Sequence, residues 1–109
     1  MVGALEGIRI LDFTMFQQGA EGTRMLADLG ADVIKVEPPL LGDLGRYMTI
    51  LGDDRFSPYF LAHNRGKRGI AIDLKAKEGR SVILKLAAEV DVVAHNFRPG
   101  VMERLGPGL

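Results

Sequence analysis

Two short apolar runs near the N-terminus constrain the fold of this chain most strongly. Residues 8–13 and 32–36 are rich in β-branched and apolar side chains, and two prolines end the second run, which is typical of strands. The 18 residues between the runs contain one helical pattern, residues 20–30, which closes on a glycine. A strand, a helix and a strand at this spacing predict a right-handed βαβ unit with parallel strands.

The rest of the chain repeats this alternation. Residues 70–74 and 91–95 are predicted strands, and residues 75–90 between them form the clearest helical pattern. A Pro-Gly step then precedes a last short helix at residues 100–105. This order predicts an α/β fold, with a Rossmann-like open parallel sheet and helices on both faces. Four strands and two main helices leave sheet edges uncovered, so we expect residues 1–109 to be an incomplete domain of a larger fold.

The segment between the second and third predicted strands is the least regular. Residues 40–56 have no clear period and several glycines and aspartates, which predicts a long loop. Residues 57–64 predict a helical turn with Pro58 at its first position.

Apolar side chains predict which side of each main helix packs on the sheet. We expect Met25, Leu26 and Leu29 to face the core from the first helix. The expected core side of the second helix consists of Val82, Ile83, Leu86, Ala87 and Val90.

Composition excludes several classes of protein. The chain has 109 residues with 14 basic and 14 acidic side chains, so its formal net charge is zero and general nucleic-acid binding is not expected. It has no cysteine, which excludes disulfides and thiolate catalysis. No apolar run is long enough to span a membrane and the N-terminus lacks a secretory pattern, so we expect a cytoplasmic protein. Its two histidines, His63 and His95, have no metal-ligand partners at a fitting spacing, so no metal site is predicted.

Polar side chains follow three of the four predicted strands. Because ligands bind beyond the carboxyl ends of parallel strands, we expect these side chains to meet along one rim. The cations among them, with Arg104 in the last short helix, suit the phosphorylated end of an elongated ligand. Taken singly, each residue could equally be a solvated surface group. The strand-end residues are Gln17 and Gln18, then Asp73, Leu74 and Lys75, and last Asn96, Phe97 and Arg98.

A nicotinamide-dinucleotide site is an alternative at this rim. Glu37 follows the second strand, 18 residues after Gly19, where a dinucleotide-binding fold places an acid on a ribose hydroxyl. The G-x-G-x-x-G pattern that accompanies such an acid is absent, as are a P-loop and a G-x-S-x-G elbow.

Four segments together resemble a known family. They are "LEGIRILDFT", "LADLGADVIKVEPP", "YFLAHNRGKRGIAIDLK" and "NFRPGVMERLG", and they cover nearly the whole chain. In this order and spacing they resemble the N-terminal part of the family III CoA-transferases, which include formyl-CoA transferase, carnitine CoA-transferase and α-methylacyl-CoA racemase.

The resemblance implies an enzyme that moves CoA between carboxylic acids through aspartyl intermediates. Its partners would be an acyl-CoA and a carboxylic acid, and two chains would interlock as a homodimer, with no metal. The racemase branch would instead invert a carbon beside a thioester. The family's nucleophilic aspartate lies beyond the last residue of this chain, so we assign no catalytic residue and expect the chain alone to be inactive.

The resemblance also implies which residues contact CoA. Gln17 and Gln18 would lie near the thiol end, and Arg104 would bind phosphate. Two positions depart from the family pattern: Pro38 stands where several members have Arg, and Ala20 follows Gly19 where a proline is usual. The stretch along adenine and ribose would be Ile72, Asp73, Leu74 and Lys75, and the pantetheine and diphosphate path would be lined by Asn96, Phe97 and Arg98.

The sequence therefore leaves three hypotheses for the function of this chain. The first is the CoA-binding segment of a CoA-transferase or a related acyl-CoA racemase. The second is a nicotinamide-dinucleotide-binding domain, and the third is a truncated, non-catalytic module.

Overall fold

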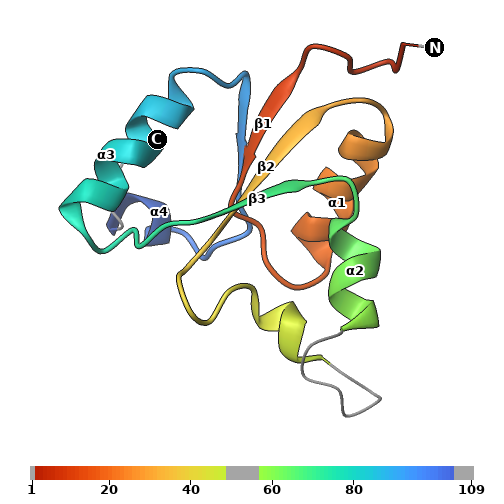
Figure 1. The fold of residues 1–109 in the computed structure, drawn as a ribbon. Coiled ribbons are helices and arrows are strands. Elements are labelled where there is room, and N and C mark those ends of the chain that lie inside the picture. Colours follow the sequence, from red (N-terminus) through yellow and green to blue (C-terminus); the bar gives the residue numbers. More distant parts are fainter. Residues whose placement is uncertain (1, 49–56, 105–109) are drawn as a thin grey trace.

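The computed structural model describes residues 2–48 and 57–104, which form a single parallel sheet flanked by helices (Figure 1). The spatial order of the strands is β3-β2-β1-β4, and every neighbouring pair is parallel. The predicted α/β fold class is therefore confirmed. In chain order the elements are β1 (Arg9–Asp12), α1 (Gln18–Asp28), β2 (Asp32–Glu37), the 3-10 helix η1 (Leu44–Tyr47), α2 (Pro58–Asn64), β3 (Arg68–Ala71), α3 (Lys77–Ala87), β4 (Val92–Ala94) and α4 (Val101–Arg104).

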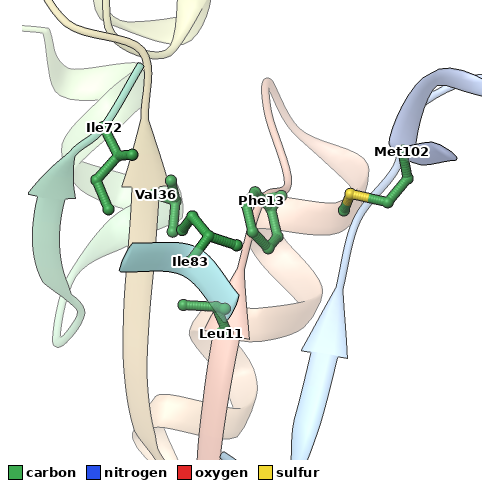
Figure 2. Packing of buried hydrophobic residues seen from close by; sticks show 6 residues of the cluster. All are labelled: Leu11, Phe13, Val36, Ile72, Ile83 and Met102. Carbon is green, nitrogen blue, oxygen red and sulfur yellow. The ribbon is translucent and has the colours of Figure 1, made fainter. Parts of the chain in front are cut away.

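Helices cover both faces of the sheet. Figure 1 shows α3 and α4 on one side and α1 and α2 on the other. On the α1 side the buried residues Ile10, Ala31 and Val33 form a small core. The larger core lies under α3, where Figure 2 shows Ile83 over the sheet. Its buried members are Leu11, Phe13, Val36, Ile72, Ile83 and Met102.

The third strand begins and ends earlier than the sequence predicted. Residues 70–74 were the expected strand, whereas β3 runs from Arg68 to Ala71. β3 pairs with β2 from Arg68 opposite Ile34, and the guanidinium of Arg68 donates to both carboxylate oxygens of Asp32 on β2, at 2.9 and 2.8 Å. The ladder ends when Ile72 N donates to Glu37 O, and Asp73 then turns the chain by accepting from Lys75 N at 2.9 Å. The strand end that carries candidate site residues is therefore a turn.

The predicted core side of α1 is wrong at two positions. Met25 and Leu29 are 54% and 50% exposed, while Leu26 packs against the smaller core as expected. The buried residues of α1 are the small Ala20 and Thr23. Thr23 is drawn inward because its hydroxyl donates to the buried carboxylate of Asp12, at 2.8 Å. Close approach of α1 to the sheet, rather than apolar bulk, decides which side it buries.

The predicted core side of α3 is correct except at Val82, which is 43% exposed. Ile83 is fully buried, and Leu86, Ala87 and Val90 pack against the larger core. The helix lies so close to the preceding turn that a Cβ on Gly79 would be 2.0 Å from Asp73 O. This approach explains the glycine in its first turns.

Part of the predicted long loop is helical. Asp43 caps η1 by accepting from Gly45 N at 2.8 Å, so residues 44–47 form a helical turn that sequence periodicity missed. Residues 49–56 of the predicted loop lie outside the described residues, as does the last residue of the predicted helix at 100–105. The helix predicted at residues 57–64 is confirmed as α2, with Pro58 first and Ser57 as its cap.

Candidate functional site

A pocket of about 190 Å³ opens at the carboxyl ends of β1, β2 and β3. The turn after β3 contributes four of the predicted site residues, and Phe97 contributes from the segment after β4. Four residues that topology placed on one rim, and Ile72, which the family resemblance added, thus share one pocket. Its lining consists of Phe13, Met15, Val36, Glu37, Pro38, Ile72, Asp73, Leu74, Lys75 and Phe97.

Aromatic packing fixes the wall formed by Phe97. Its ring lies 6.5 Å from that of the buried Phe13 and stacks on His95 at 5.6 Å, between ring centroids. The exposed His95 therefore supports an aromatic wall. The wall is apolar, whereas Lys75 and Asp73 are exposed. An apolar pocket with a cation at its edge suits a ligand that has a flat, apolar part and a separate anionic part.

The other predicted site residues lie outside this lining. Gln17 caps α1 and Gln18 begins it, and both are exposed. Arg98 is exposed before the turn that leads into α4, and Arg104 is exposed as the last residue of α4. Asn96 does not line the pocket, but its side chain bonds to the backbone of Met15, which does.

Three of the predicted site residues are exposed cations without an ion pair. Within residues 2–48 and 57–104, Lys75, Arg98 and Arg104 form none, and neither do Lys77, Arg80 and Lys85 of α3, so its place in the pocket lining is what distinguishes Lys75. Unpaired exposed cations remain available to an anionic ligand. No cluster of side chains in the described part of the chain could hold a metal ion.

Glu37 is committed to a partner inside the protein. Its Oε1 accepts from Arg46 Nη2 at 2.7 Å, and its Oε2 accepts from Arg46 Nε at 2.7 Å and from Asp43 N at 2.6 Å. Burial alone would raise the pKa of Glu37, but these hydrogen bonds outweigh it and hold the pKa below its usual value. Both carboxylate oxygens of Glu37 are occupied, so this residue is not free to bind the ribose of a nicotinamide dinucleotide.

Two buried ion pairs lie beneath the loops of the rim. Lys35 Nζ lies 2.8 Å from Asp43 Oδ2, and Lys67 Nζ lies 2.9 Å from Asp12 Oδ2. Burial would raise the pKa of Asp43, but Lys35 and the N–H groups of Gly45 and Phe16 hold it below its usual value. The sequence reasoning missed Lys35 and Lys67. The signal that could have found Lys35 is its inward position on a strand predicted to be buried.

A larger hollow of about 500 Å³ shares Glu37 and Pro38 with the first pocket. Arg46 and Phe60 line it, with the guanidinium carbon 3.7 Å from the ring centroid. The hollow also lies at the ends of β2 and β3, but none of the residues that the resemblance implies for CoA lines it.

The sequence model of CoA-transferase family III matches residues 5–108. This chain belongs to CoA-transferase family III. The formyl-CoA:oxalate CoA-transferase of Bradyrhizobium sp. (strain ORS 278) is 47% identical over 108 residues, covering 97% of this chain and 25% of the relative. The acetyl-CoA:oxalate CoA-transferase of Acetobacter aceti is 46% identical over 105 residues, covering 95% of this chain and 26% of the relative.

A solved structure of the family has the same fold. The crystal structure of Rv3272 from Mycobacterium tuberculosis superposes with a TM-score of 0.87 at 43% identity, over 97% of this chain and 28% of that one. The family resemblance read from the sequence is confirmed. The chain spans about a quarter of the length of the curated relatives it matches. No helix among the described residues is long and apolar enough to cross a membrane.

Proposed function

We propose that this chain is the CoA-binding segment of an enzyme that transfers CoA between carboxylic acids. The observation that carries the proposal is the pocket at the strand ends, in which the turn after β3 and Phe97 meet. Family membership supports CoA as the ligand. We propose that residues 1–109 form an incomplete domain, and that the whole enzyme is a cytoplasmic homodimer.

We propose one direction for CoA along the rim, which the apolar lining and the exposed cations support. Adenine and ribose would lie along the turn from Ile72 to Lys75, where the lining is apolar. The phosphates would meet Lys75, Arg98 and Arg104, which have no ion-pair partner among the described residues. Pantetheine would then pass Asn96 and Phe97 toward Gln17 and Gln18. Pro38, where several members have Arg, lines the pocket and offers no charge for the ligand.

Catalysis would need a carboxylate that attacks the thioester. Asp12 and Asp43 are fully buried and paired with lysines, so neither is available as a nucleophile. Asp73 is exposed at the pocket but accepts a hydrogen bond from Lys75 N and turns the chain. The family resemblance implies a nucleophilic aspartate beyond this chain, so we propose a binding role for residues 1–109.

Titration calorimetry with CoA and NAD, side by side, tests the proposal. We expect the chain to bind CoA and to bind NAD more weakly, because both oxygens of Glu37 are occupied. Tighter binding of NAD would contradict the proposal. Absence of binding to either ligand would favour a non-catalytic module instead.

An activity assay tests the division of roles. The purified 109-residue chain is expected to show no acyl-CoA turnover when supplied with a carboxylic acid acceptor. Turnover by this chain would mean that one of its own carboxylates acts as the nucleophile.

A further inference from the structure

Side chains from distant parts of the sequence hold the loop between β1 and α1. Asn96, which follows β4, makes two hydrogen bonds to the backbone of Met15: its Oδ1 accepts from Met15 N and its Nδ2 donates to Met15 O, both at 2.9 Å. A side-chain amide that pairs with both backbone groups of one residue replaces a strand partner at this point. The loop after β1 is therefore tied to the segment after β4.

The other side of the same loop is held by the buried pair Lys35 and Asp43. Lys35 Nζ donates to Thr14 O at 2.8 Å, and Asp43 Oδ1 accepts from Phe16 N at 3.0 Å. Thr14 N completes the set by donating to Asp12 Oδ1 at 2.9 Å. Five successive backbone groups, from Thr14 N to Phe16 N, thus have side-chain partners.

A surface loop does not need side-chain partners at five successive backbone groups. Phe16 has φ of 62°, in the left-handed region that a bulky residue rarely adopts, and it is 43% exposed. A strained residue persists only where its surroundings fix it, and such positions gather at ligand sites. The next residues are Gln17 and Gln18, whose direction follows from the conformation of Phe16. Gly19 is also confined, since a Cβ there would lie 2.6 Å from Thr14 Cγ2 and 3.3 Å from Asn96 Cβ.

We propose that Asn96 is a positioning residue, which together with Lys35 and Asp43 holds the Thr14–Phe16 loop ready for the pantetheine arm of CoA. The inference rests on the proposed function, because it takes the direction of CoA from there. It adds to the sequence expectation in one respect: the amide of Asn96 acts through the loop that it holds.

The proposal predicts that loss of Asn96 affects the binding of the two ends of CoA differently. A loop set free by loss of Asn96 must be ordered again when pantetheine binds, and ordering one residue costs free energy equivalent to about tenfold in affinity. The adenine end of CoA is bound by the turn after β3, so its binding does not require the Thr14–Phe16 loop to be ordered. Adenosine 3′,5′-bisphosphate, which has the nucleotide end of CoA but no pantetheine, therefore serves as the matched probe.

The experiment compares Asn96→Ala with the native chain by calorimetry, using CoA and adenosine 3′,5′-bisphosphate. We expect the variant to bind CoA about tenfold more weakly and to bind adenosine 3′,5′-bisphosphate as the native chain does. Hydrogen exchange at Met15 N should also accelerate, because its acceptor is gone. Asn96 is exposed, so the fold is retained, and Ser81→Ala on the exposed side of α3 is the control.

A second pair of variants tests the buried side of the loop. Asp43→Asn and Asp43→Ala both remove the ion pair with Lys35, but only Asn keeps an oxygen that can accept from Phe16 N. We expect Asp43→Asn to bind CoA more tightly than Asp43→Ala. Equal CoA affinity of these two variants would overturn the role given to Asp43.

The outcomes distinguish this inference from the proposed function. If the native chain binds CoA and Asn96→Ala binds it equally well, the inference fails and the proposed function stands. Equal weakening of both probes also overturns it, because the damage is then general. If the native chain binds no CoA, the proposed function fails and the inference fails with it.

Discussion

Lys67 Nζ lies 2.9 Å from Asp12 Oδ2, and 2% and 0% of the two side chains are exposed. The same ammonium group donates to Ala20 O at 3.0 Å and to Asn64 Oδ1 at 2.9 Å. One buried charge thus joins the end of β1, the first turn of α1 and the end of α2. Burial lowers the pKa of Lys67, although attraction by Asp12 opposes this.

Removing this cation should destabilise the fold strongly. Lys67→Met leaves Asp12 buried without its counter-charge, and breaking a buried pair in this way costs about 3–5 kcal/mol. Urea unfolding measures the loss. Lys85→Met, at an exposed position of α3, is the control and should stay within about 0.5 kcal/mol of the native chain. The double variant Asp12→Asn/Lys67→Met should be more stable than Lys67→Met, and the reverse order would contradict the pairing.

Glu37 should make stability depend on pH in the acid range. Burial opposes ionisation of Glu37, but Arg46 and the Asp43 N–H outweigh it, so its folded pKa lies below the unfolded value of about 4.3. The stabilisation by ionised Glu37 is therefore present above that value and is lost as the pH falls through the folded pKa.

The comparison of native chain and Glu37→Gln isolates this effect. We expect the difference in free energy of unfolding to be largest near neutral pH and to shrink below about pH 4. The exposed Glu89 gives the matched control, because Glu89→Gln should show no such change. A pH-independent difference for Glu37→Gln would show that the ion pair with Arg46 does not stabilise the fold.

Two helical glycines should respond oppositely to alanine. A Cβ on Gly79 would lie 2.0 Å from Asp73 O, so Gly79→Ala must move α3 or the turn after β3 and should cost about 1–3 kcal/mol. A Cβ on Gly22 in α1 would meet no atom within 4 Å, so Gly22→Ala should stabilise by about 0.5–1 kcal/mol. Thermal unfolding of the two variants checks the signs, and stabilisation by Gly79→Ala would refute the close approach.

Lys75 should contribute charge to CoA binding. Lys75→Ala should weaken CoA binding by about tenfold, near the lower end for a charge-assisted hydrogen bond because the side chain is exposed. The loss should shrink at high salt, which screens exposed charges. Titration at two salt concentrations measures both effects, and Lys85→Ala is the matched control. An equal loss for the two lysines would mean that general charge, and not the pocket, attracts CoA.

The fold class followed from the sequence because alternation of strands and helices is a local pattern. The elements were placed correctly wherever hydrophobic period and turn residues agreed, as in α2 with Ser57 and Pro58. The error at β3 arose because Arg68 joins the sheet by pairing with Ile34 of β2, a partner distant in the sequence that no local pattern indicates. The exposure of Met25 was not predicted for a related reason. The hydroxyl of Thr23 donates a hydrogen bond to Asp12, and this bond orients α1.

The site was predictable to the level of strand ends and no further. Topology brought Lys75 and Phe97 to one pocket, because parallel strands present their carboxyl ends together. The partners of Asn96 and Glu37 were not predictable, since each depends on a loop that must fold around it. That Asn96 bonds to Met15 is a contact between residues 81 apart, and no local pattern encodes it.

The position of β1 in the middle of the sheet has a consequence for biosynthesis. Ile10 pairs with Val33 on one side and with Val92 on the other. A ribosome that adds about 5–20 residues per second needs several seconds between making Ile10 and making Val92. During that interval one edge of the nascent central strand is open to other polypeptides, so chaperone demand should be greatest before β4 emerges from the exit tunnel.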